Sequence, residues 1–315
     1  MTEVRGRSIV LASMFTGTLA RAVLEALAYS DIFEFPLKLK ELYSYLPMQA
    51  GMEQLPDTLK SLENLVEEKD GFYFLSGHEE IVEIRQQREA RSRELLPHAL
   101  RYGRILGSLS FIRMAALTGS LAVLNISKNA DFDYMLVTVK GRVWTARAFA
   151  LLFNRWVRLW GHTICPNLII AETALQWPLH DLYSARELCQ MIPISGQAVY
   201  QKLLLANEWA KDFLPNAFLD LCGLPTKMQN QISALQTFLE IPLHGKFGDK
   251  LELWEMNRKI ARFSKQAGFG EETVFNSEVC QGNFHHHRAW TREVFEQKLS
   301  MLEKEMAVAL KVAVT

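Results

Sequence analysis

The stretch that decides the fold runs Met114-Ala-Ala-Leu-Thr-Gly-Ser120 and, ten residues later, Asp131-Phe-Asp-Tyr-Met-Leu-Val-Thr138. The first part is an apolar run that ends in Thr-Gly-Ser, and the second is an apolar run that opens with two acidic residues. Residues i and i+2 of a β-strand lie on the same face, so Asp131 and Asp133 should point the same way while Phe132 points into the opposite layer. Two neighbouring carboxylates repel each other unless a cation lies between them.

The neighbouring segments extend these two runs into a sheet. Residues 111–117 and 132–139 are strand-like, and Gly119-Ser120 forms a turn in which glycine lets backbone amides approach an anion closely. Residues 142–160 have a helical pattern, and residues 167–171 form a third apolar run. Strand, helix and strand in alternation predict a small α/β sheet with helices on at least one face.

Length and composition limit what this motif can belong to. A chain of 315 residues with 49% hydrophobic and 10% aromatic residues is long enough for two or three domains with substantial cores. Lys plus Arg equals Asp plus Glu, at 35 each, so no net charge attracts the chain to nucleic acid or to an acidic membrane. These values exclude a disordered or fibrous protein.

Cysteine usage and hydropathy predict a soluble, cytoplasmic protein without a membrane partner. The four cysteines are far apart in the sequence, with no C-x-x-C pair and no secretory leader, which is typical of reduced thiols. The most apolar longer segment, residues 143–160, carries Arg147, Arg155 and Arg158, and charges at those depths argue against a membrane span.

Residues 1–77 predict a compact, mainly helical module. Helices are expected over residues 20–29 and 37–46 and from a third start at residues 55–57, followed by a short strand over residues 72–75. Three helices and a strand follow one another in this order in a winged helix-turn-helix domain.

The charges of this module do not favour DNA binding. The third helix, where base-reading side chains would lie, contains Glu63, Glu67 and Glu68 against Lys60 and Lys69. That is a poor surface for phosphates, so we expect the module to make packing or protein contacts.

Residues 78–108 predict a charged helix that bridges the first module to the next. Its apolar stripe is narrow, so most of its surface should be solvated. Its arginines could contact a nucleotide, but pairing with glutamates of the same helix is favoured. The arginines are Arg85, Arg88, Arg91 and Arg93, and the glutamates are Glu80, Glu83, Glu89 and Glu94.

Gly119-Ser120, ten intervening residues and then Asp131-Phe132-Asp133 between apolar residues resemble the signature of the DNA polymerase beta-like nucleotidyltransferase superfamily. The resemblance covers residues 106–194. The whole layout is also similar to that of uncharacterised prokaryotic nucleotidyltransferase-domain proteins with a winged-helix-like start. It implies an enzyme that uses a nucleoside triphosphate and a divalent metal ion.

This resemblance and the segment patterns together give an α+β fold with a small, mixed, nucleotidyltransferase-like sheet. The expected domains are a winged-helix-like module over residues 1–77, a bridging helix over 78–108, a catalytic domain over 109–195 and a helical C-terminal domain over 196–315. Helices are expected over residues 196–213, 227–239, 251–265 and 289–312.

The chemistry of nucleotidyl transfer fits these residues. Mg²⁺ prefers oxygen ligands and often binds through one or two carboxylates together with substrate phosphates, so Asp131 and Asp133 would hold Mg²⁺, or Mn²⁺ in its place. The amides and hydroxyl groups of Thr118, Gly119 and Ser120 would then hold the terminal phosphates. Arg142 and Arg147 could reach a phosphate, but surface pairing accounts for them equally well.

Members of the superfamily usually carry a third carboxylate on a later strand. Glu172, directly after residues 167–171, is our first choice, with Asp181 and Glu187 as alternatives. Asp181 also has the position of a helix N-cap before residues 182–191.

The run His285-His286-His287 suggests a metal site at first sight. Consecutive side chains point in divergent directions, so one ion is rarely bound by all three, and contact of a single histidine with a substrate phosphate is favoured over a metal role.

Two functions remain open from the sequence. The first is an enzyme that moves a nucleoside monophosphate onto a hydroxyl group of an unidentified small-molecule or protein acceptor. The alternative is a winged-helix DNA-binding regulator or adaptor whose nucleotidyltransferase-like domain senses nucleotides and is catalytically weak. No P-loop, dinucleotide-binding, G-x-S-x-G or H-E-x-x-H motif competes with these hypotheses.

Overall fold

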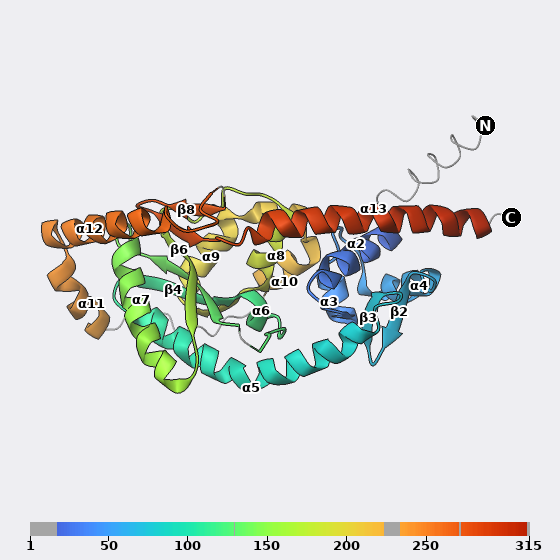
Figure 1. Cartoon of the computed structure of the whole chain (residues 1–315), viewed down its shortest axis with the longest axis horizontal. Coiled ribbons are helices and arrows are strands. Elements are labelled where there is room, and N and C mark those ends of the chain that lie inside the picture. The colour runs from blue at the N-terminus through green and yellow to red at the C-terminus, as the bar shows by residue number, and fades with distance from the viewer. Residues whose placement is uncertain (1–17, 129, 224–233, 271, 314–315) are drawn as a thin grey trace, which may run out of the picture.

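A six-stranded mixed sheet forms the centre of the larger part of the molecule (Figure 1). The computed structural model describes residues 18–128, 130–223, 234–270 and 272–313. The strand order is β7-β4-β5-β6-β9-β8, in which β5 and β6 are parallel and the other neighbours are antiparallel. The strands are β4 (Ile112–Thr118), β5 (Phe132–Thr138), β6 (Ile164–Ala171), β7 (Ile192–Ser195), β8 (Thr273–Phe275) and β9 (Val279–Gly282).

Helices cover both faces of this sheet, which explains why β4 and β5 are apolar almost throughout. One face packs against α5 (Glu80–Ser108) and α7 (Val143–Val157), and the core there contains Phe132 and Tyr134. The other face packs against α8 (Leu182–Gln190), α9 (Gln197–Ala206) and α10 (Pro215–Gly223).

Asp133 lies on the face covered by α8. Met135 and Val137 belong to the core on that face, and side chains two positions apart share a face of a strand. Phe132 points into the opposite core, as the alternation of the sequence predicts. The acidic side chain therefore lies against a helix rather than at an open sheet surface.

The N-terminal module, which we define as residues 18–77, has its own three-stranded antiparallel sheet in the order β1-β3-β2. Along the chain, its elements follow one another as helix, strand, helix, helix, strand and strand. The elements are α2 (Leu19–Asp31), β1 (Leu37–Lys38), α3 (Leu39–Ser44), the 3₁₀ turn Met52–Gln54, α4 (Leu55–Ser61), β2 (Val66–Lys69) and β3 (Phe72–Leu75). Their apolar faces form a separate core.

The predicted third helix is shorter than the sequence pattern indicates. It ends at Ser61, and Val66–Lys69 forms a hairpin with Phe72–Leu75 instead. Asp70 and Gly71 have φ angles of 55° and 78°, the left-handed conformation that tight hairpin turns require. The glutamates of β2 thus lie on a strand, and our assignment of them to a helix was wrong.

The helix α5 is the element that corresponds to the bridge predicted over residues 78–108. Near its start, Ile81 and Val82 pack on Phe72 and Phe74 of the N-terminal module. Near its end, Tyr102 and other apolar residues of the helix join the core of the central sheet. Figure 1 shows α5 running along one side of both parts.

The region after residue 196 does not form the separate helical bundle that we expected. Two short strands, β8 and β9, extend the central sheet beyond β6, and α12 (Lys246–Phe263) lies beside α7. The last helix, α13 (His287–Ala313), returns to the N-terminal module and packs on α2 through Phe295 and Leu302 (Figure 1). Strands of three and four residues are too short to show a period in the sequence.

The remaining elements connect these layers. They are α6 (Gly119–Ala122), α11 (Ala234–Glu240) and the 3₁₀ turns Arg158–Trp160, Glu208–Asp212 and Ile241–Leu243. Over the described ranges of the chain, no helix is both long enough and apolar enough to cross a membrane. The α+β class predicted from the sequence is confirmed.

Candidate functional site

The Gly-Ser turn, Gly119-Ser120, lies directly beside Asp133. Thr118 at the end of β4 pairs with Asp133 near the start of β5, and α6 begins at the next residue. Gly119 has a φ of +67°, and a Cβ atom placed there would lie 2.5 Å from Oδ2 of Asp133. Glycine is therefore required twice, once for the backbone angle and once because the carboxylate fills the space of a side chain.

Asp133 carries an unusual charge state for an aspartate. Burial, together with the negative charges of Glu187 and Asp131, raises its pKa to about 7, while a hydrogen bond from the Cys165 thiol acts in the opposite direction. Asp131 stands just before the strand and is exposed. The two aspartates are thus close enough to interact, as the i and i+2 spacing predicts.

Glu187 is the third member of this group, which we call the acid cluster: Asp131, Asp133 and Glu187. Glu187 comes from α8, the helix that covers the same face of the sheet as Asp133. Burial raises the pKa of Glu187 to about 7 as well. Across the described ranges, none of the three carboxylates forms an ion pair with a Lys, Arg or His side chain.

A thiol occupies the position beside Asp133 on the next strand. Cys165 of β6 is the register partner of Asp133, and its thiol donates a hydrogen bond to the carboxylate. Burial, together with the two aspartates, raises the pKa of Cys165 to about 12, so the thiol stays protonated at neutral pH. Cys165 can therefore orient the Asp133 carboxylate as a neutral donor.

The structure does not bring Glu172 to the aspartates, and its assignment as their third partner was wrong. The backbone amide of Glu172 donates a 2.8 Å hydrogen bond to the carbonyl oxygen of Thr138, at the far end of β5. Asp133 and Thr138 are five positions apart, which corresponds to about 16 Å along a strand. Two carboxylates at that separation cannot share one metal ion.

Arg142 is held by structural contacts rather than placed for phosphate binding. Its guanidinium forms a 2.8 Å ion pair with Asp249 and donates a 3.1 Å hydrogen bond to the carbonyl oxygen of Leu243. It follows Gly141, beyond the end of β5 that is remote from Asp133. The structure therefore does not support our prediction that Arg142 binds a nucleotide.

Arg147 lies on the wrong side of the sheet for the acid cluster. It belongs to α7, stacks over the Phe263 ring at 5.1 Å and forms a hydrogen bond with the Cys280 thiol. The core beneath α7 contains Phe132 and Cys280, on the face opposite Asp133. Our prediction that Arg147 contacts a phosphate is therefore not supported either.

Thr118 and Ser120 remain beside the acid cluster. Thr118 is buried, whereas Ser120 is partly exposed at the first turn of α6. The carbonyl oxygen of Ser120 accepts a 2.7 Å hydrogen bond from the amide of Asn125. Its hydroxyl has no hydrogen bond to any residue that the structure describes, so it is available to a ligand.

The spacing of the acid cluster limits how a metal could be held. No three His, Cys, Asp or Glu side chains in the described part of the chain are close enough to hold one ion. Mg²⁺ usually keeps several waters and binds through one or two carboxylates plus substrate phosphates. The residues therefore fit Mg²⁺ held jointly by carboxylates and a bound triphosphate, and they do not fit a closed cage such as a structural zinc site.

The start of α13 lies close to α8, and the two carboxylates there, Asp181 and Glu272, are already engaged. Asp181 accepts a 2.8 Å hydrogen bond from the amide of Ser184 and pairs with Arg288, which confirms its predicted N-cap role. Glu272 accepts a 2.7 Å hydrogen bond from the amide of Ala289 in the first turn of α13.

The three histidines 285 to 287 lie where α13 begins. The rings of His285 and His287 are 5.7 Å apart between centroids, and burial and the neighbouring His285 lower the pKa of His287. No metal-binding group within the described residues includes them. Whether one of them contacts a phosphate stays a prediction.

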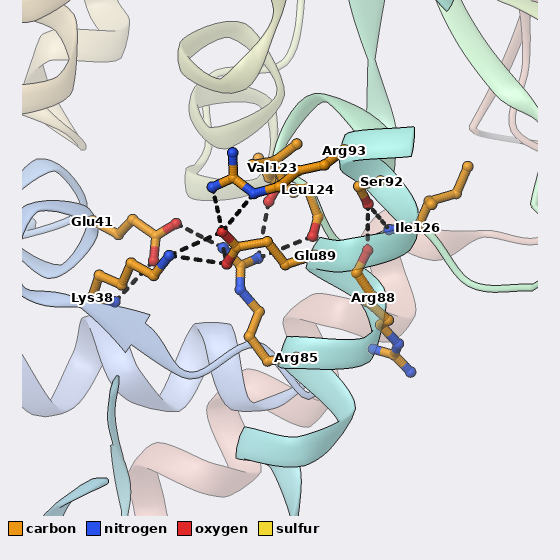
Figure 2. Close-up of polar contacts among 10 residues, drawn as sticks. All are labelled: Lys38, Glu41, Arg85, Arg88, Glu89, Ser92, Arg93, Val123, Leu124 and Ile126. Carbon is orange, nitrogen blue, oxygen red and sulfur yellow. Dashed lines mark hydrogen bonds and ion pairs between the residues drawn. The ribbon is translucent and has the colours of Figure 1, made fainter. Parts of the chain in front are cut away.

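The loop that connects the Gly-Ser turn to the acid cluster is anchored by a buried arginine from α5 (Figure 2). Arg85 is 1% exposed, donates a 2.9 Å hydrogen bond to the carbonyl oxygen of Val123 and pairs with Glu41 of the N-terminal module at 2.9 Å. Its guanidinium also stacks on the Phe35 ring at 3.8 Å. One side chain thus joins the module, the bridging helix and the loop.

A second contact on the same helix holds the next part of the loop. The hydroxyl of Ser92, which is fully buried, accepts a 3.1 Å hydrogen bond from the amide of Ile126, as Figure 2 shows. Asn125 donates a 3.1 Å hydrogen bond to the carbonyl oxygen of Phe33. Of the arginines of α5 that we expected to pair within the helix, Arg93 pairs with Glu89 as predicted, whereas Arg85 and Arg88 pair with Glu41 and Glu34 of the N-terminal module.

Arg85→Met is expected to lower the free energy of unfolding by about 3 kcal/mol, because Glu41 and the loop carbonyl lose a buried partner. Arg93→Met is the matched control, since Arg93 pairs with Glu89 on the same helix but is 62% exposed at its side chain. It should cost less than about 1 kcal/mol. Urea unfolding measures both, and equal losses would contradict the anchoring role of Arg85.

Comparison with known proteins gives no indication of function. No protein-family model matches the chain, and neither a curated protein nor a solved structure is significantly similar to it.

Proposed function

We propose that the chain is a metal-dependent nucleotidyltransferase of the DNA polymerase beta-like type. It would move a nucleoside monophosphate from a nucleoside triphosphate to a hydroxyl group of a small-molecule or protein acceptor. One observation carries the proposal: Asp133 and Glu187 are half-buried carboxylates without a cationic partner among the described residues, and a Cβ atom on the glycine of the neighbouring Gly-Ser turn would displace the Asp133 carboxylate.

The raised pKa values of Asp133 and Glu187 support a cation site. A buried carboxylate without a counter-charge is costly, so each group holds a proton up to a pH of about 7. A divalent cation would replace those protons and offset the cost of burial. When bound, Mg²⁺ supplies charge neutralisation at the transferred phosphate and lowers the pKa of the attacking hydroxyl.

The residues of this chain would bind the phosphates and orient the carboxylates. The backbone of Gly119 and the free hydroxyl of Ser120 would hold the terminal phosphate oxygens, as such turns do in other anion sites. The Cys165 thiol fixes the rotation of the Asp133 carboxylate. Asp131, exposed at the entrance of β5, lies on the solvent side, where the triphosphate would enter.

The chain departs from the superfamily pattern at the third carboxylate. The strand position beside Asp133 is Cys165, and Glu187 reaches the cluster from a helix instead. We therefore assign the third acidic role to Glu187, which was an alternative in the sequence-based prediction, and we withdraw Glu172.

Glu187→Gln and Glu172→Gln test this assignment as a pair of identical chemical changes. Glu187→Gln should lower the rate of triphosphate-dependent transfer by about 10²-fold, because charge stabilisation at the reacting phosphate is lost. Glu172→Gln should leave the rate within about twofold, as expected for a remote surface position. Steady-state pyrophosphate release measures both, and the reverse order of effects would restore Glu172.

The N-terminal module is proposed to be a winged-helix domain. Its element order and its β1-β3-β2 sheet support this proposal. A basic surface is not evident on its third helix, α4, where Lys60 stands near Asp57, and Lys69 of β2 pairs with Glu79. We accordingly favour a protein-contact or packing role for the module over DNA reading.

Two observations favour the alternative function, a regulator or adaptor with a nucleotide-sensing, catalytically weak domain. The described residues bring no three metal ligands together, and the third strand carries a thiol where a carboxylate is expected. A salt-sensitive mobility shift of genomic DNA fragments by the full chain, without any pyrophosphate release, would favour this alternative.

The proposal itself is tested by incubating the full chain with each labelled nucleoside triphosphate, Mg²⁺ and a metabolite extract. Mass spectrometry should find a nucleotidylated product that is absent when the metal is chelated. The same product formed in the presence of a chelator would contradict a metal-dependent transferase.

A further inference from the structure

A second site lies where the N-terminal module meets α8 and α13. A cavity of about 170 Å³ opens there, lined by Tyr45 of the module, Arg186 of α8, Phe213 and Phe295. A single water molecule needs about 10–15 Å³ of such space, so this cavity has room for a ligand of several heavy atoms.

Arg186 is buried in the wall of this cavity without an anionic partner. Its residue exposure is 3%, and its guanidinium lies 3.8 Å from the Tyr45 ring centroid and 4.7 Å from that of Tyr29. Within the described residues it forms neither an ion pair nor a hydrogen bond, and its buried Nε has no partner. Burial lowers its pKa.

In the described part of the chain, other buried arginines have the carboxylate partner that Arg186 lacks. Arg85 is 1% exposed and meets Glu41 at 2.9 Å, and the 15% exposed side chain of Arg113 meets Glu240 at 2.7 Å. An arginine without a counter-ion is expensive in a low-dielectric environment, and the tyrosine faces compensate only part of that cost. The planar fork of a guanidinium is built to bind an oxyanion through two parallel hydrogen bonds.

We propose that this cavity binds a small molecule through an oxyanion group, a carboxylate or a phosphate, that pairs with Arg186. The apolar rings of Phe213 and Phe295 contact the rest of the ligand. Asp212 also lines the cavity, and Glu25 does so while paired with Arg21 at 2.8 Å. A ligand with one anionic end at Arg186 and an uncharged or cationic remainder fits these charges.

The site adjoins the acid cluster. Arg186 and Glu187 are consecutive on α8, and the charges of both act on Tyr29. A ligand on Arg186 therefore contacts the helix that carries Glu187 and two elements of the N-terminal module, α2 and the Tyr45 segment. The ligand site does not depend on nucleotide transfer, because its test measures binding alone.

Thermal unfolding of the full chain with three probes tests the proposal. Propionate and inorganic phosphate provide the two oxyanions, and propionamide is the uncharged isostere of propionate, all at equal ionic strength set with sodium chloride. At least one oxyanion should raise the Tm saturably in the millimolar range, and propionamide should not. The oxyanion that binds more tightly identifies the chemical class of the natural ligand.

Arg186→Met should abolish the Tm rise, whereas Arg258→Met should keep it, since Arg258 lies on α12 with a side chain that is 47% exposed. If Arg186→Met does not fold, Arg186→Lys replaces it and should weaken binding about tenfold, because it keeps the charge but loses the paired N–H groups. In wild type, the NMR signal of one buried arginine Nε–H group should shift during the titration.

The proposal is overturned if neither oxyanion gives a saturable rise in wild type. It is also overturned if Arg186→Met or Arg186→Lys responds as wild type does, or if propionamide raises the Tm saturably.

Discussion

Replacing Asp131 and Asp133 together by asparagine is expected to lower nucleoside triphosphate-dependent pyrophosphate release by about 10³-fold or more. The change removes the charges that would hold Mg²⁺ while it preserves the shape of both side chains, and electrostatic stabilisation is the main source of catalysis in phosphoryl-type transfer. Among the residues that the structure describes, no cationic side chain pairs with Asp133, and its pKa is raised, so its negative charge does not stabilise the folded chain. The double variant should therefore remain folded.

Asp220→Asn is the matched control for this double variant. Asp220 is an exposed acid on α10, outside the acid cluster, so its neutralisation should change the rate by less than about twofold. Circular dichroism and thermal unfolding establish that each variant keeps its fold. Pyrophosphate release at the wild-type rate in Asp131→Asn/Asp133→Asn would exclude the acid cluster as the catalytic site.

Without divalent cations, the protein is expected to become less stable as the pH rises from about 4.5 to about 7. The pKa of Asp133 is about 7 in the folded chain and 3.8 without structure, and that of Glu187 is about 7 against 4.5. Between those values the folded state holds protons that the unfolded state has lost, so raising the pH favours unfolding. At about 1.4 kcal/mol per pKa unit for each group, the loss should amount to several kcal/mol, and it should level off above pH 7.

Magnesium should reverse much of this loss, because the cation binds the deprotonated carboxylates of the folded state only. At pH 8 we expect Mg²⁺ to raise the Tm, and at pH 5, where both groups are protonated, we expect little effect. Asp133→Asn should flatten the pH dependence and remove most of the magnesium effect. Stability that increases between pH 5 and pH 8 in the absence of metal would contradict the assigned charge states.

The part of the site that follows from local sequence was predictable. Alternation along a strand places Asp131 and Asp133 together, and the Gly-Ser turn has to follow β4, so Thr118 and Gly119 come next to Asp133 once the two strands pair. These relations require only one strand pair and one turn.

The third carboxylate was not predictable in the same way. Glu187 lies close enough to raise the pKa of Asp133 because α8 packs on one particular face of the sheet, a tertiary relation that no local period records. Glu172 failed because β6 runs parallel to β5, which carries its end away from Asp133. The direction of a neighbouring strand would have been the deciding signal.

Two other predictions, the length of the third helix and the role of Arg142, were wrong although the sequence contained a signal against each. Asp70-Gly71 is a strong hairpin signal, and it would have ended the third helix of the N-terminal module at Ser61 and predicted the strand Val66–Lys69. Arg142 follows Gly141, at the end of β5 remote from Asp133, so strand direction alone would have removed it from the phosphate site. By contrast, β8 and β9 are too short for any pattern to indicate them.

Calorimetric titration of magnesium chloride into the full chain at pH 7, in two buffers with different ionisation enthalpies, tests the acid cluster most directly. A metal site on Asp133 and Glu187 predicts saturable binding that releases about one proton, since two groups with a pKa of about 7 are each half protonated at that pH. Both the heat and the proton release should disappear in Asp133→Asn. Magnesium binding without proton release, or binding that Asp133→Asn leaves unchanged, would contradict a metal site at these carboxylates.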